Sequence, residues 1–267
     1  MLGELIAAAP LFLLLAVRAL ALIQTAPLLS SEANPPAARV ALAGFAAYAA
    51  FPSAQAINAA GLELFSLRFV FLAAGEAIIG IIMGFFITVI FSVFGTAGQF
   101  FSLPMGFSAS ETFDPLSQTE NPLMGQYLNL VAMLVFLSMG GFRELFLGGF
   151  WRSVQSINVA SLAAGREAVT GMLIAGLSRL FLDALVISLP ILGTLFITSL
   201  ATGLISKAAP QINILSEGFP ISITVAFLLI FTTMPFMVEA FGRVIDSGFG
   251  AIENLYIQIG RRVTGVP

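Results

Sequence analysis

The chain has 267 residues, of which 58% are hydrophobic and only 9% are charged, and its formal net charge at neutral pH is −3. It contains neither cysteine nor histidine. These counts exclude a thiol nucleophile, a disulfide, a haem ligand and an ordinary zinc site, and they remove the commonest general base at neutral pH. No basic stripe exists to replace phosphate counterions, so a nucleic-acid partner is excluded too. We therefore expect no cofactor and no enzyme.

Long stretches of the chain carry no charged residue. The uncharged runs are 40–62, 77–110, 121–142, 184–206 and 218–238. Runs of roughly 18 or more mostly apolar residues are what a helix needs to cross the hydrocarbon core of a bilayer. The sequence therefore predicts a polytopic protein of the lipid bilayer.

Six apolar segments predict an all-α fold of about six long, partly broken helices arranged as hairpins. They are about 5–28, 39–60, 69–101, 123–142, 172–204 and 218–240. No polar linker is long enough to separate domains, so we expect a single domain over 1–267.

Two of these segments are longer than a simple membrane span. As one helix, 69–101 would be roughly 50 Å long, against a hydrocarbon core of about 30 Å. Segment 172–204 is equally long, and Pro190 should kink or break its helix. Either neighbouring protein surrounds these helices in an assembly, or they tilt strongly in the membrane.

One face of the third segment carries an acid and two glycines. Glu76, Gly80 and Gly84 recur at four-residue spacing, and such a pattern lets two helix backbones approach closely. We expect a seam between helices or subunits, with Glu76 on a polar partner. The alternative is ordinary packing within the chain, with Glu76 reaching the membrane edge.

Charges inside apolar segments should be paired or functional, because they are costly in lipid. Arg18 lies in the first segment. Arg179 and Asp183 lie four residues apart in the fifth, where they can form an ion pair on one helix. A proton relay is the alternative, but it would need several carboxylates in a line.

The stretch 104–115 combines loop-forming residues with apolar side chains. Met105, Phe107 and Phe113 could block a cavity by excluding water, or the loop could fold over its own helices. Helix-hairpin turns are expected at two places. Their residues are Asp114 and Pro115 in the first, and Pro210, Gln211, Asn213 and Pro220 in the second.

The order and spacing of these motifs resemble the FliR/SctT family, the export-gate subunit of flagellar and injectisome type III secretion systems. The matching residues cover nearly the whole chain. They are Ala26-Pro27-Leu28-Leu29, Pro36, Arg39-Val40, Glu76, Gly80, Gly84, Gly98-Gln99-Phe100, Met105-Gly106-Phe107-Ser108, Asp114-Pro115, Pro122, the Phe136 to Gly141 stretch, Leu189-Pro190, Ala209-Pro210-Gln211, Asn213 and Gly218-Phe219-Pro220.

The resemblance implies an all-helical subunit made of a FliP-like part, about 1–170, and a FliQ-like part, about 171–267. It implies one copy in a hetero-oligomeric ring with FliP and FliQ, on which FlhB docks, with FlhA nearby. This ring belongs to the flagellar basal body in the bacterial inner membrane. Unfolded flagellar proteins pass through its pore.

The resemblance also implies a pore plug in the loop that holds Met105, Phe107 and Phe113. This chain departs from the family pattern at Ser110-Glu111-Thr112, where some relatives place more aromatic residues. Of the two paralogous systems, the flagellar one is favoured. A small-solute transporter or channel remains the alternative from another class, because broken helices often flank its binding site.

Overall fold

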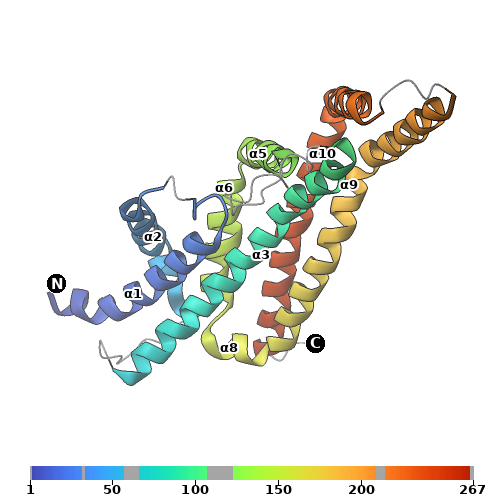
Figure 1. Cartoon of the computed structure of the whole chain (residues 1–267). Coiled ribbons are helices and arrows are strands. Elements are labelled where there is room, and N and C mark those ends of the chain that lie inside the picture. Colours follow the sequence, from blue (N-terminus) through green and yellow to red (C-terminus); the bar gives the residue numbers. More distant parts are fainter. Residues whose placement is uncertain (1, 32–33, 57–65, 107–122, 209–213, 265–267) are drawn as a thin grey trace. The chain divides into compact units, whose positions relative to one another are not determined.

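The computed structural model describes residues 2–31, 34–56, 66–106, 123–208 and 214–264, and all regular structure in these ranges is helical (Figure 1). The long helices are α1 (Leu2–Thr25), α3 (Leu67–Met105), α9 (Arg166–Ala208) and α10 (Ile214–Thr264). The shorter ones are α2 (Pro36–Ala50), η1 (Phe51–Ala56), α5 (Leu123–Ser138), α6 (Gly141–Arg143), the π-helical η2 (Glu144–Trp151), α7 (Arg152–Ser156) and α8 (Val159–Ala164).

The chain folds as two compact units that interleave along the sequence. Unit 1 comprises Met1–Ile90, Gly140–Leu177 and Asp246–Pro267, and unit 2 comprises Phe91–Met139 and Ser178–Ile245. Helices α3, α9 and α10 each contribute one part to either unit. The expected parts 1–170 and 171–267 divide the chain differently and stay a prediction.

Helix length and composition fit a membrane protein, which confirms the predicted fold class. Three described helices are long and apolar enough to cross a bilayer, over Leu67–Met105, Arg166–Ala208 and Gly218–Gly260. A bent pair, Leu123–Ser138 with Gly141–Ser156, would make a fourth span if it crosses as one. Helix α2 is too short, at 15 residues. Fewer than six of the expected segments therefore qualify as spans among the described residues.

One proline prediction is wrong, because Pro220 lies inside α10 rather than in the turn before it. Helix α9 is not broken at Pro190, and a kink at that residue stays a prediction. A proline deletes one backbone hydrogen bond, whereas a break would leave several polar groups unsatisfied in apolar surroundings. The continuous helix is therefore the less costly solution. Helix α10 also continues to Thr264, well past the expected end at 240.

Helices α1 and α2 pack together in unit 1. Helix α2 buries Ala43, Ala47 and Ala50, which recur at helical spacing on one face. Helix α1 buries larger side chains, including Leu14 and Leu22. The small face of α2 lets the two helix axes approach, as is typical of helices that associate in membranes.

An aromatic cluster fills the core of unit 2. The ring of Phe91 makes edge contacts with Phe94 and Phe136, at centroid distances of 6.1 and 5.5 Å. Phe94 also contacts Phe241 of α10 at 4.5 Å. All four rings are buried, so they join α3, α5 and α10 through contacts in the range that aromatic pairs prefer.

Helices α3 and α5 cross at short range in the same unit. A Cβ atom added to Gly98 would lie 2.5 Å from the backbone N and Cα of Gly125. Neither backbone can yield without moving a whole helix. The absence of a side chain at Gly98 is therefore a condition of this crossing.

We expect Gly98→Ala to destabilise the protein by about 1–3 kcal/mol, because the added methyl group overpacks two backbones. Gly95→Ala is the matched control on the same helix, where an added Cβ meets nothing within 4 Å. There, the better helix propensity of alanine should stabilise by up to about 1 kcal/mol. Denaturant unfolding of the purified protein in detergent measures both. Equal effects of the two substitutions would contradict the crossing.

Candidate functional site

The best-defined polar cluster in unit 1 is a buried ion pair between α1 and α3. Arg18 Nε donates a hydrogen bond to Glu76 Oε2 at 2.5 Å, and the two side chains are 0% and 1% exposed. The same guanidinium donates through Nη1 to Ser153 Oγ at 3.3 Å and through Nη2 to the carbonyl of Ile157 at 3.0 Å. One side chain therefore joins three parts of the chain that are far apart in sequence.

The bond to Ile157 has a structural cause. Helix α7 ends at Ser156, and Ile157, the residue that follows it, has an extended backbone (φ −125°, ψ 127°). The next residue, Asn158, precedes α8 and caps it through a reciprocal pair of hydrogen bonds with Ser161. A carbonyl at such a break has no helical partner, and burial without a partner would be costly. Arg18 supplies the donor, and Glu76 neutralises Arg18.

The two glycines near Glu76 face α1 of the same chain. A Cβ atom on Gly80 would lie 2.8 Å from the Cβ of Ala21, and one on Gly84 would lie 3.0 Å from the carbonyl oxygen of Leu22 and would run into the side chain of Thr25. The backbones of α1 and α3 thus approach closely at this face. Participation of another subunit in this seam stays a prediction.

Met105 and Gly106 mark the end of α3. Met105 is fully buried. Gly106 has φ +87°, and a side chain there would run into the ring of Phe219 in α10. A left-handed glycine is a common way to end a helix. It ends α3 immediately before the residues for which the sequence predicts a plug.

Several predicted site residues lie outside the described part of the chain. They are Phe107, Phe113, Asp114, Pro115, Pro210, Gln211 and Asn213. Arg179 and Asp183 are described and lie on α9, the first exposed and the second half-buried. Their ion pair stays a prediction.

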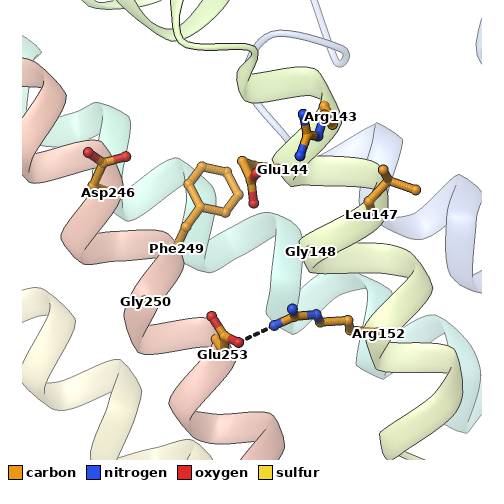
Figure 2. Close-up of a pocket in the computed structure, with 9 residues that line it drawn as sticks. All are labelled: Arg143, Glu144, Leu147, Gly148, Arg152, Asp246, Phe249, Gly250 and Glu253. Carbon is orange, nitrogen blue, oxygen red and sulfur yellow. Dashed lines mark hydrogen bonds and ion pairs between the residues drawn. The ribbon is translucent and has the colours of Figure 1, made fainter.

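Sequence reasoning missed a polar pocket in unit 1 (Figure 2). One wall is formed by residues 143–152, and the other by residues 246–253 of α10. Its volume is about 360 Å³. The lining residues are Arg143, Glu144, Leu147, Gly148, Arg152, Asp246, Phe249, Gly250 and Glu253. The two walls lie about a hundred positions apart in the sequence, so no local sequence pattern could have paired them. The only sequence signal for a polar site was that both segments fall outside the uncharged runs.

One end of this pocket is closed by an ion pair. Arg152 Nη1 donates to Glu253 Oε1, and both side chains are about half exposed (Figure 2). Three positions further along α10, Tyr256 is buried and donates from its hydroxyl to the carbonyl of Gly149 at 2.9 Å. These two contacts fix α10 against the π-helical segment. No group of three or more acidic side chains in the described ranges is placed to hold a metal ion.

We expect Glu76→Gln to lower the free energy of unfolding by about 3–5 kcal/mol, because it leaves the Arg18 charge buried and unpaired. The double variant Arg18→Met/Glu76→Leu should be less destabilised than either single variant. It removes both charges and leaves only the Ser153 and Ile157 groups without their donor. Denaturant unfolding in detergent gives the double-mutant cycle. Additive single effects would contradict direct coupling of the two side chains.

We expect Gly84→Leu to reduce assembly with the expected partner subunits while insertion into the membrane persists, because overpacking typically costs about 1–3 kcal/mol. Gly171→Leu is the control, since an added Cβ there meets nothing within 4 Å. Co-purification yield from solubilised membranes measures assembly. A normal yield for the Gly84 variant would show that the seam is misplaced.

Known proteins resemble this chain along most of its length. The sequence model of the family "Bacterial export proteins, family 1" matches residues 9–248. The flagellar biosynthetic protein FliR of Escherichia coli is 31% identical over 243 residues, covering 91% of this chain and 91% of the relative. FliR of Bacillus subtilis is 28% identical over 253 residues, covering 94% and 96%. The surface presentation of antigens protein SpaR of Shigella sonnei is 25% identical over 162 residues, covering 60% and 61%.

Proposed function

Because this chain belongs to the bacterial export proteins of family 1, we propose that it is a non-enzymatic subunit of the flagellar type III export gate. In this role it helps to form and seal the channel through which unfolded flagellar proteins leave the cell. The observation that carries the proposal is similarity to FliR proteins along more than nine-tenths of both chains. A match to SpaR also exists, but it covers only 60% of this chain. The flagellar system is therefore favoured over the injectisome.

We further propose its setting and partners. The chain would lie in the inner membrane at the flagellar basal body, in a ring with FliP and FliQ, with FlhB docked on the ring and FlhA nearby. Its parts 1–170 and 171–267 would correspond to a FliP-like and a FliQ-like half. The long helices α3, α9 and α10 support this setting, because helices of 39, 43 and 51 residues exceed what one bilayer can cover.

The alternative of a small-solute transporter has less support than it had from the sequence alone. It depended on broken helices, and α9 is continuous through Pro190, which leaves only the bent pair Leu123–Ser138 with Gly141–Ser156 among the described helices. In addition, the buried charges Arg18 and Glu76 bind each other, so they are not directed toward a substrate pocket.

Deletion of the gene tests the proposed function. Flagellar proteins should disappear from the culture medium while their intracellular levels persist, and the gene supplied in trans should restore export. Export of flagellar proteins that continues in the deletion strain would overturn the proposal.

The seal of the closed gate is proposed to involve Met105, Phe107 and Phe113. A pore wide enough for an unfolded chain leaks ions unless an apolar element displaces water from it. Deletion of 106–113, or Phe107→Gly with Phe113→Gly, should therefore make the assembled complex ion-permeable. Conductance of the reconstituted complex reports the leak. A variant that assembles normally and stays as tight as the wild type would place the seal in another subunit.

A further inference from the structure

We propose that the polar pocket of unit 1 binds a basic side chain, arginine or lysine, of a neighbouring protein chain. This inference rests on the proposed role of the chain as one subunit of an export assembly, and it adds a contact site and the chemistry of the partner. Within the pocket, the binding groups are the carboxylates of Glu144 and Asp246 and the ring of Phe249 (Figure 2).

Charge is concentrated in this pocket. The chain has 11 basic and 14 acidic residues, and five of these line this single pocket (Arg143, Glu144, Arg152, Asp246 and Glu253). Many large apolar side chains of the long helices are exposed elsewhere. The side chains of Glu144 and Asp246 are exposed, so their carboxylates are accessible to a charged group of a partner.

The charge that remains unpaired within the pocket is negative. Arg152 and Glu253 neutralise each other at one end of the pocket. Of the other three charged residues, two are acids. In the described part of the chain, neither Glu144 nor Asp246 forms an ion pair. The pocket therefore has one carboxylate more than it has guanidinium groups, and it complements a cation.

The shape and lining of the pocket suit a long basic side chain. Phe249 projects from α10 toward Glu144 (Figure 2), and an aromatic face attracts a guanidinium or ammonium group. The apolar lining of Leu147 and Phe249 suits the aliphatic stem of such a side chain. Next to Phe249 on the α10 wall, Gly250 leaves space for this side chain, since an added Cβ at Gly250 meets nothing within 4 Å.

These features select a protein side chain over other cations and over anions. The acidic groups do not converge on a metal-binding arrangement in the described residues. An anionic lipid headgroup would meet net negative charge. The wall that holds Glu144 is π-helical (Glu144–Trp151), and such turns occur frequently at functional sites.

The chain contains no cysteine, which permits a direct test. Leu147→Cys, at the exposed rim of the pocket, is labelled with a thiol-reactive benzophenone in membranes that contain the complete export apparatus. Illumination should join this chain to another protein, and mass spectrometry should locate the adduct beside an arginine or lysine. The chain without the introduced cysteine is the control for labelling elsewhere.

Charge-neutralising variants in the Leu147→Cys background test whether the two carboxylates bind the basic side chain of the partner. Glu144→Gln and Asp246→Asn should each lower the adduct yield by about threefold, and both together by about tenfold, as for partly exposed ion pairs. Glu239→Gln is the matched control, because it removes an exposed carboxylate from the same helix α10 and breaks only the pair with Arg243. It should leave the yield unchanged.

Arg143→Gln tests whether the pocket attracts a cation or an anion. Loss of the Arg143 guanidinium makes the pocket more negative, so the adduct yield should rise and should persist to higher salt concentrations. A fall in yield with this variant would overturn the proposal and indicate an anionic partner. No adduct, or an adduct indifferent to Glu144→Gln and Asp246→Asn, would also overturn it. Co-purification of the wild-type chain with other export proteins is measured in parallel. If that fails, the proposed function fails; if it succeeds without a charge-dependent adduct, only the pocket assignment fails.

Discussion

The arrangement of unit 1 depends on one buried ion pair. Arg18 and Glu76 are almost completely removed from solvent, and a buried charge without a partner is among the most costly features a protein can contain. Each charge therefore requires the other, which fixes α1 against α3. Because Arg18 also binds the carbonyl of Ile157, the break between α7 and α8 is fixed to the same point. The pair thus determines position more than it adds stability, since an apolar pair of similar size could pack equally well.

Close approach of helix backbones stabilises the other helix contacts. Helices surrounded by lipid gain little from burying apolar side chains, because lipid tails are equally apolar. They associate through contact area, which increases when small residues let the backbones approach. Gly80 and Gly84 serve this purpose in unit 1, and Gly98 does so in unit 2. Larger side chains fill the remaining space, such as the ring of Phe94 against Phe241 of α10 in unit 2.

The sequence predicted the helices well, because few structures other than membrane helices contain such long uncharged apolar runs. It also placed Glu76, Gly80 and Gly84 on one face, which follows from helical periodicity alone. It could not identify Arg18 as the partner of Glu76, since the two are 58 positions apart and local spacing says nothing about such pairs. The same limit hid the polar pocket. Pro220 was misjudged, and α9 is not broken at Pro190, because breaking a helix in apolar surroundings costs more than one lost hydrogen bond.

The exposed surface of the described long helices is strongly apolar. Helices α3, α9 and α10 are too long for one bilayer, and many large apolar side chains on them are exposed, Phe231 to 84%. Surfaces of this kind need lipid or protein around them. Membership of a hetero-oligomeric export gate is tested most directly by native mass spectrometry, after purification in mild detergent from cells that express the neighbouring export genes. We predict a multi-subunit complex that contains a single copy of this chain. A monomer or a homodimer under these conditions would contradict the proposed role.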